Sequence, residues 1–576
     1  MRSAATRPGA SGRSCGLMLL GYLGPLQIRR SLAAGDGVEE IYMKHVRAVV
    51  LFALAFVCAQ PAWPHEDESP RPGDPDQVGR VDFLVSCSAA AQSEFNHAVA
   101  LLHSFYYPAA VSAFTHVAEL DPDCAMAYWG VAMSWWYPLW YPPTEASLRE
   151  GQAAVDKARN LGTRTARERG YIDAIATFYD GFDKQNHPTR ALLYEKAMRQ
   201  LHEAFPDDRE AAAFYALAMQ ATIDPNDRTY AKQLKSAKLL ESLSAEQPNH
   251  PGLVHYIIHA YDYPGLSDRA LDAARRYGQI APAVPHALHM PSHTFTYLGL
   301  WGEAIGADTA AAATAKRSGD TNSQLHSMDY LVYAYLQSGQ EQRAKGVLDE
   351  LTAVSLAGVD HTIAIDYTLA AAPARYTIEV RHWSEAVALT PAPSRFLATE
   401  ALTRYARALG AVHVGQAELA STEIESLAAL RGALFKAKQD YWAKQVEIQR
   451  QTASAWLAWA NGDANHALAQ MRAAADLEDS TYKHPVTPGQ IAPARELLGD
   501  LLIELHQPKE ALSEYEASLQ ATPNRFNGLY GAAHSAELAG DMAKARMYYL
   551  QLLALCDGMN SARPELQQAR MVLARQ

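Results

Sequence analysis

Histidines with helical spacing occupy a short stretch near the middle of the chain. His255, His259 and Asp262 follow one another at intervals of four and three residues. In an α-helix, these intervals place side chains on one face, one above the other. Imidazole and carboxylate groups on a common face can form a transition-metal site or an acid–base pair.

The same pattern recurs twice further along the chain. His286, His289 and His293 come next, and a shift of 34 residues superposes His255 on His289 and His259 on His293. A third stretch has His326, Asp329 and Tyr333 at the equivalent positions. Six histidines within 72 residues favour a functional cluster over histidines that only form hydrogen bonds between helices. Tandem duplication of a structural histidine is the alternative explanation.

Neutral imidazoles prefer Zn, Cu, Fe or Ni to Mg or Ca. Packed helices lie about 8–10 Å apart, so imidazoles of adjacent helices can reach one ion. The two pairs spaced by four residues are the predicted ligands of a Zn, Cu or Fe ion: His255, His259, His289 and His293. Four neighbours are predicted to add ligands, orient them or transfer protons: Asp262, His286, His326 and Asp329. The residue pattern selects no particular reaction or substrate.

A repeat of 34 residues identifies the elements that carry these side chains. Its clearest copy and the next one match at five positions: Leu498, Gly499, Leu502, Ala511 and Tyr515, then Ala532, Ala533, Ala536, Ala545 and Tyr549. Pro523 follows the first copy, and Gly540 lies at the turn of the second. Small residues allow two helices of a hairpin to approach closely, and proline ends the second helix. The pattern resembles the tetratricopeptide repeat, which implies an all-α fold: an α-solenoid of helical hairpins with a concave groove.

The same register divides the chain into segments. The predicted parts are N-terminal repeats (81–250), central repeats with the histidines (251–350), degenerate helical repeats (351–480) and C-terminal repeats (481–576). Ahead of them we expect a non-native upstream extension (1–42), a signal peptide (43–59) and a flexible, Pro- and acid-rich leader (60–80).

The resemblance implies that the histidine positions line the concave groove, and further residues are candidates for its surface. Trp129 and Met133 fall on equivalent positions of the second repeat, although core packing is the favoured reading for them. Tyr333 occupies a groove position in the third stretch with the histidine pattern. His484 lies in a proline-punctuated loop that either connects repeats or folds over the groove. Arg375 and Glu379, four residues apart, are predicted to form an ion pair.

Composition and the N-terminus point to an exported protein. The run 48–57 is apolar but too short to span a bilayer, and Cys58 and Ala59 suit cleavage before Gln60, so we expect a periplasmic or secreted product without a membrane span. The whole chain has a formal charge of −12, and loses seven basic and three acidic residues with 1–59, which leaves −16. Such a charge disfavours nucleic acid as a partner. Cys87 and Cys124 either form a disulfide or remain free thiols.

Three functions are compatible with these features. The first is an exported solenoid that binds a transition metal through its histidines and performs metal-dependent chemistry. The second is an interaction scaffold whose groove binds an extended peptide or a partner helix. The third is an enzyme that uses the histidines as acid and base without a metal.

Overall fold

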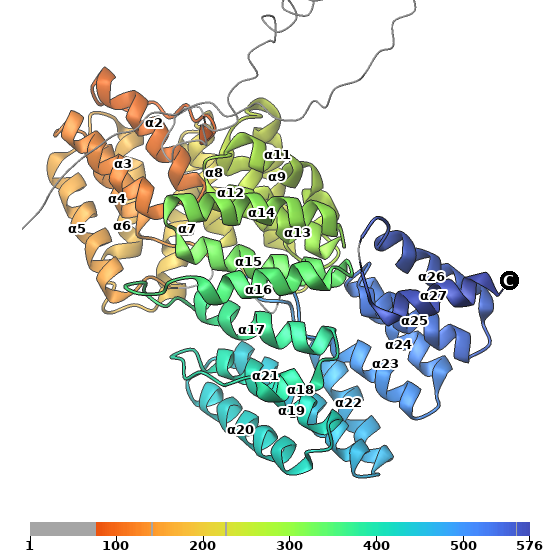
Figure 1. Cartoon of the computed structure of the whole chain (residues 1–576). Coiled ribbons are helices and arrows are strands. Elements are labelled where there is room, and N and C mark those ends of the chain that lie inside the picture. The colour runs from red at the N-terminus through yellow and green to blue at the C-terminus, as the bar shows by residue number, and fades with distance from the viewer. Residues whose placement is uncertain (1–76, 140–141, 225–226, 560, 576) are drawn as a thin grey trace, which may run out of the picture. The chain divides into compact units, whose positions relative to one another are not determined.

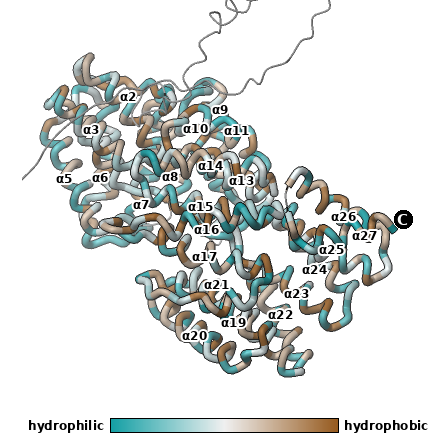
Figure 2. Tube along the Cα trace, in the orientation of Figure 1, coloured by the Kyte–Doolittle hydropathy of each residue, from teal (hydrophilic) through white to brown (hydrophobic). Residues whose placement is uncertain are grey.

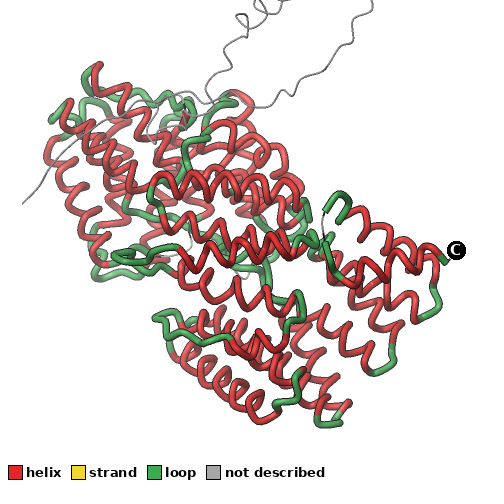
Figure 3. Tube along the Cα trace, viewed as in Figure 1, coloured by secondary structure: helices red, strands yellow, loops and turns green. Residues whose placement is uncertain are grey.

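The computed structural model describes residues 77–139, 142–224, 227–559 and 561–575. These parts consist of α-helices and short connections, without a β-strand (Figures 1 and 3). The predicted upstream extension, the signal peptide and residues 60–76 of the leader lie outside the described residues. The predicted all-α fold is confirmed, because consecutive helices pack as hairpins of the tetratricopeptide type.

The first four hairpins precede the histidine region. Their helices are α2 (Ala89–His103), α3 (Tyr107–Leu120), α4 (Ala125–Ser134), α5 (Glu145–Leu161), α6 (Ala166–Tyr179), α7 (His187–Ala204), α8 (Arg209–Gln220) and α9 (Ala231–Glu246). Polar residues begin several of them: Thr144 accepts a hydrogen bond from the amide of Ser147 at α5, and Asp208 does the same for two amides at α8. Such caps satisfy amides that have no partner within the helix.

The central repeats hold the histidines. Their helices are α10 (Pro251–Tyr261), α11 (Leu271–Ile280), α12 (Pro285–His289), α13 (Pro291–Tyr297), α14 (Trp301–Ser318), α15 (Thr321–Gln337) and α16 (Glu341–Ala353), with the 3-10 turn η2 (Ser267–Ala270) before α11. Proline begins α10, α12 and α13, where its missing amide hydrogen costs nothing. The sequence pattern predicts one helix for the second histidine stripe, and Pro291 divides it into α12 and α13.

Helical hairpins continue to the end of the chain. They comprise α17 (Ile363–Glu379), α18 (Trp383–Ala388), α19 (Leu397–His413), α20 (Ala417–Lys436), α21 (Asp440–Ala460), α22 (Ala464–Asp479), α23 (Ala494–Glu504), α24 (Pro508–Ala521), α25 (Phe526–Leu538), α26 (Met542–Leu555) and α27 (Pro564–Ala574). The segment with the weakest repeat pattern, 351–480, is therefore built from helix pairs like its neighbours.

The repeat pattern has the packing cause that the sequence suggests. A Cβ atom added to Gly499 of α23 would lie 2.6 Å from the ring of Tyr515 on α24, so only glycine allows this approach. Tyr515 and Ala511 are buried. Apolar residues alternate with polar ones along the helices (Figure 2), and the buried ones form continuous clusters between adjacent hairpins.

Residues 77–80, at the end of the predicted leader, pack against the repeats. The prediction of a flexible segment is therefore wrong for these four residues. The amide of Arg80 donates to the carbonyl of Asn249, and the carbonyl of Gln77 accepts from the amide of Ala283. Val78 is buried in the same core as the N-terminal and central repeats. This short segment therefore lies against the repeats that carry the first histidines.

Candidate metal centre

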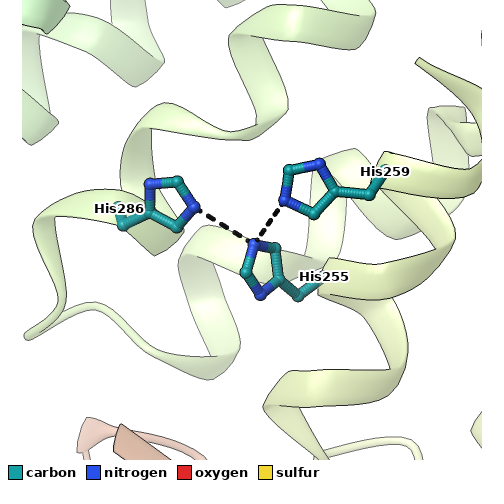
Figure 4. Close-up of side chains that lie close together, drawn as sticks. All are labelled: His255, His259 and His286. Atoms are coloured by element: carbon teal, nitrogen blue, oxygen red, sulfur yellow. Dashed lines mark hydrogen bonds between the residues drawn. The ribbon is translucent and has the colours of Figure 1, made fainter. Parts of the chain in front are cut away.

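The first cluster contains three histidines, and we call it triad 1. His255 and His259 are one turn apart on α10, and His286 comes from α12 (Figure 4). The Nε2 atom of His255 lies 2.9 Å from Nε2 of His259 and 3.1 Å from Nε2 of His286. All three rings thus turn the same nitrogen toward a common point.

A fixed hydrogen bond on the far side determines the tautomer of His255. Its Nδ1 donates to the backbone carbonyl of His103 at 2.6 Å, and a carbonyl can only accept. The neutral ring therefore has no hydrogen on Nε2, and its lone pair points at the other two rings. Phe105 covers the cluster, with its ring centroid 4.4 Å from that of His255, 5.7 Å from His259 and 5.9 Å from His286.

The second cluster, triad 2, contains His289 of α12, His293 of α13 and His326 of α15. The Nε2 atoms of His289 and His293 are 3.1 Å apart, and the ring centroid of His326 lies 4.5 Å from that of His289. The hydroxyl of Tyr330 approaches Nε2 of His293 to 3.3 Å. Ligand atoms from the three histidines lie within 4.8 Å of one another, as they do in triad 1.

Carboxylates hold both histidine rings of the triad 2 pair from behind. Nδ1 of His289 lies 2.6 Å from an oxygen of Asp308 on α14, and Nδ1 of His293 lies 2.9 Å from an oxygen of Asp262. Where each Nδ1 donates to its carboxyl group, both Nε2 lone pairs face each other. A carboxylate or carbonyl behind a histidine is the usual arrangement around metal-bound imidazoles, because it fixes the ring and raises its basicity.

Burial keeps these imidazoles neutral. Loss of hydration lowers the pKa of His259 and of His289 to about 3 and that of His293 to about 4. The same cause lowers the pKa of His255, His286 and His326, and nearby imidazoles lower it further in each case. A neutral imidazole is the form that binds a metal.

The two carboxyl groups differ in their environment. Burial raises the pKa of Asp308 well above its ordinary value. Burial also opposes ionisation of Asp262, but the charge of Lys483 and the bond to His293 outweigh it, so the pKa of Asp262 is lowered. The Lys483 ammonium lies 3.7 Å from the Asp262 carboxylate, and both side chains are almost completely buried.

The two triads are neighbours in one buried cluster. The ring centroids of His286 and His289, one from each triad, are 6.4 Å apart, and both side chains belong to α12. Burial lowers the pKa of His286, and the rings of both triads lower it further. The four predicted ligands therefore do not surround one ion by themselves. Each pair instead joins a third histidine: His286 for the first pair and His326 for the second.

A third polar cluster stands beside triad 1 and has a different character. Nε2 of His103 lies 2.8 Å from one oxygen of Glu210, and Nε2 of His250 lies 2.9 Å from the other. Nδ1 of His103 lies 2.8 Å from the hydroxyl of Tyr256. Each imidazole thus has its own carboxylate oxygen. Because His103 also supplies the carbonyl for His255, this network supports the position of triad 1.

Several predicted residues have other places in the structure. Asp329 is buried, but it pairs with Arg375 and is not part of either triad. The predicted Arg375–Glu379 ion pair is wrong, because Glu379 pairs with Arg525 instead. Both residues lie on α17, four positions apart, but each pairs with a charged side chain of another helix: Arg375 with Asp329 and Glu379 with Arg525.

The residues predicted to line the groove are buried in the structure. Trp129 is buried among aromatic rings such as Phe83 and Tyr171, and Met133 lies against the Tyr194 hydroxyl, so the groove alternative for both is wrong and the core reading is correct. Tyr333 is buried too, and its hydroxyl accepts a hydrogen bond from Arg525. The histidines themselves are deeply or partly buried, so they do not line an open groove.

The proline-punctuated loop folds against triad 2. Backbone carbonyls of Pro485 and Thr487 each lie 3.1 Å from the Tyr330 hydroxyl, which also contacts His293. His484 packs between Tyr441 and Trp442, and burial lowers its pKa to about 3. The loop therefore covers the cluster, while His484 is held by aromatic rings rather than by the metal candidates.

A large cavity lies beside this loop. It has a volume of about 670 Å³, and its lining includes Tyr297, Tyr333, Tyr482, Lys483 and Arg495. Lys483 links the cavity to the cluster, since its ammonium also faces Asp262. Asp262 in turn contacts His293, so a chain of polar side chains runs from the cavity to triad 2.

Three functional residues were not found from the sequence. Asp308 is a carboxylate on the buried face of the alanine-rich helix α14. A carboxylate among the alanines of this face is the one sequence feature that indicates a buried polar partner. His103 and Phe105 reach triad 1 from a repeat about 150 residues away, as the hydrogen bond between His103 and His255 shows. No local spacing indicates such a contact.

Fold and site together define a class: an all-α solenoid of tetratricopeptide-type hairpins with two buried histidine triads. No protein-family model matches the chain, and no curated protein matches it. Among solved structures, it is similar to the human IFIT1 dimer with m7Gppp-AAAA, at 11% identity over 75% of this chain and 90% of that one, with a TM-score of 0.31.

Two further solved structures show the same level of likeness. The APC/C hetero-tetramer Cut9-Hcn1 has 13% identity over 83% of this chain and 96% of the other, with a TM-score of 0.27. Yeast Tom70 has 11% identity over 84% and 96%, with a TM-score of 0.32. In the described part of the chain, no helix is both long and apolar enough to cross a membrane.

Proposed function

We propose that this protein is an exported solenoid that binds transition-metal ions through triad 1 and triad 2. The observation that carries the proposal is the close approach of two Nε2 atoms in triad 2. Both His289 and His293 are held from behind at Nδ1 by carboxyl groups, and their Nε2 atoms are 3.1 Å apart. When both Nδ1 atoms carry the hydrogen, two Nε2 acceptors at this distance repel each other unless a proton or a metal ion lies between them.

The distances suit coordination. Two imidazoles bound tetrahedrally to one ion, with bonds of about 2.1 Å, have nitrogens about 3.4 Å apart. The distances of 2.9–3.1 Å within the triads need only a small opening to reach that value. Three histidine ligands leave an open coordination position, which is characteristic of catalytic rather than structural metal sites.

Export rests on a separate observation. Cys87 and Cys124 form a disulfide that ties the segment before α2 to the start of α4. Disulfides persist in oxidising compartments and are rare in the cytosol. Together with the apolar run at 48–57, the disulfide supports a periplasmic or secreted location.

A peptide-binding scaffold is the second candidate, and one feature favours it. The cavity beside the proline loop is large enough for side chains of a bound segment, and its walls combine tyrosine rings with Lys483 and Arg495. The buried histidines do not contribute to that surface. Metal binding requires the histidines and peptide binding in the cavity does not, so substitution of the histidines distinguishes the two functions experimentally.

Metal analysis of the full chain, purified without a histidine tag, tests the proposal. We expect stoichiometric transition metal after loading and dialysis, and loss of metal in His259→Ala and in His293→Ala. The control is His116→Ala, because this histidine is exposed on α3. Absence of stoichiometric metal, or equal metal content in all variants, would leave the scaffold function as the better account.

A further inference from the structure

We infer that triad 1 and triad 2 form one dinuclear copper centre that binds dioxygen between its two ions. This inference rests on the proposed function and adds the identity of the metal, the coupling of the two sites and the class of ligand. It is carried by the neighbouring position of the triads, by their all-imidazole composition and by the charges around them.

The position of α12 brings the triads together. Its first histidine, His286, turns to His255, while His289 turns to His293. These two rings of α12 lie 6.4 Å apart. Ions held by adjacent triads are near enough to share a bridging ligand if each shifts toward the other, since two-metal sites have separations of about 3.5–4 Å.

The ligand set favours copper. Each triad offers three neutral imidazoles and no thiolate, and the carboxylates of Asp262 and Asp308 bind the Nδ1 side of the rings. Iron in oxygen-activating sites commonly has two histidines and a carboxylate as direct ligands. Among divalent first-row ions, a nitrogen site binds copper most tightly.

Charge favours the cuprous state in the resting centre. Two divalent ions would bring four positive charges into a buried cluster that already contains Lys483, 3.7 Å from Asp262. Two cuprous ions bring only two, so less charge has to be balanced by the Asp262 carboxylate. Uncompensated buried charge is expensive, so the smaller charge is the stable one.

The surroundings suit a small ligand. Phe105 lies over all three rings of triad 1, and the proline loop contacts Tyr330 at triad 2. A closed apolar cover excludes bulk water and protects a reactive bound ligand. Dioxygen is small and apolar, so it can pass side chains that would exclude a larger substrate.

The binding step balances without another reactant. Two cuprous ions each give one electron to one dioxygen molecule, which becomes peroxide bridging two cupric ions. The O–O bond is weakened but retained, no proton is taken up, and release of dioxygen returns both electrons to the copper ions.

The test uses the full chain loaded anaerobically with cuprous ion and then exposed to dioxygen. We expect two copper ions and one dioxygen per chain, an intense near-ultraviolet band, and no electron paramagnetic resonance signal, because bridged cupric ions pair their spins. His286→Ala and His326→Ala each remove a partly buried ligand from one triad. Each variant should bind one copper ion and reduce dioxygen uptake at least tenfold, because one cuprous ion supplies only one of the two electrons.

Controls keep the outcomes distinct. His116→Ala should behave as the parent chain, and the circular dichroism of each variant shows whether it has folded. Protein loaded with two zinc ions should take up no dioxygen. Two copper ions with independent signals and no uptake, or one bound ion only, would overturn the dinuclear centre and leave metal binding in place. No stoichiometric copper, zinc or other transition metal would overturn both.

Discussion

The hydrogen bonds behind the imidazoles make the most specific residue-level claim. Asp308 contacts His289 through Nδ1 and no other histidine through a direct hydrogen bond among the described residues. Asp308→Asn keeps the shape but cannot become a carboxylate when His289 binds an ion, so the ring of His289 becomes a poorer ligand. Loss of such a partner typically costs about 10–100-fold in metal affinity.

Competition titration with a chelator measures this prediction. We expect Asp308→Asn to weaken binding at triad 2 by about 10–100-fold and to leave triad 1 close to its original affinity. Asp272→Asn serves as the control, because Asp272 is exposed and pairs only with Arg276. Equal affinities in the two variants would mean that Asp308 is a structural group.

The sequence predicts the histidine pairs well and their grouping poorly. Spacings of four identify His255 with His259 and His289 with His293, since one helix face carries each pair. The third member of each triad comes from another helix, and its direction depends on the division of the stripe at Pro291 and on packing between repeats. Asp308 and Phe105 are set by the same long-range packing, which no local interval encodes.

At the scale of elements, the join between α22 and α23 predicts a pH dependence of stability. Glu478, near the end of α22, accepts a hydrogen bond from the amide of Ala494 at the start of α23. Burial raises the pKa of this carboxyl to about 8, with a smaller contribution from Asp479 in the same direction, whereas Arg525 opposes the shift. The protonated form is thus the one that the fold prefers.

The sign of the effect follows from proton binding. Between the ordinary pKa near 4.5 and the folded value near 8, the folded chain holds a proton that the unfolded chain releases. Stability from Glu478 is therefore complete below pH 4.5 and falls as the pH rises to 8, by about 1.4 kcal/mol per unit.

Urea unfolding between pH 5 and 8 measures this slope. Glu478→Gln retains an oxygen for the amide of Ala494 and cannot ionise. The free energy of unfolding of this variant should therefore lack the slope of about 1.4 kcal/mol per pH unit that Glu478 contributes in the parent chain. Asp476→Asn, at an exposed position on the same helix, should retain the slope of the parent chain. Parallel curves for the parent and Glu478→Gln would contradict the assignment.

Element existence was more predictable than element boundaries. The 34-residue repeat gives the hairpins α23–α24 and α25–α26, because glycine is required where Tyr515 packs and the equivalent Tyr549 is buried in the same way. It also extends to the weak segment 351–480, where the helix pairs α17–α22 continue. The loop around His484 is different, because its position against Tyr330 depends on carbonyl groups and not on side-chain types.

For the molecule as a whole, the C-terminal repeats are joined to the central ones through a buried arginine. Arg525, at the start of α25, pairs with Glu379 of α17 at 2.5 Å and with Glu496 of α23 at 2.7 Å, and it donates to the hydroxyl of Tyr333 on α15. In a solenoid most contacts are between neighbouring repeats. This group instead connects helices that are about 150 to 200 residues apart in the chain, as its hydrogen bonds show.

Removing Arg525 should therefore separate the two regions thermodynamically. Arg525→Met keeps apolar volume but leaves two buried carboxylates without their counter-charge, which typically costs about 3–5 kcal/mol. We expect the free energy of unfolding to fall by that amount. We also expect the denaturant unfolding curve to split into two transitions, the earlier one from the C-terminal repeats. Arg472→Met removes an exposed ion pair with Glu510 and should change stability by no more than about 0.5 kcal/mol. A cost for Arg525→Met no larger than that for Arg472→Met, or unfolding in one step, would contradict this prediction. The C-terminal repeats would then be held by packing such as that between α15 and α25 rather than by this ion cluster.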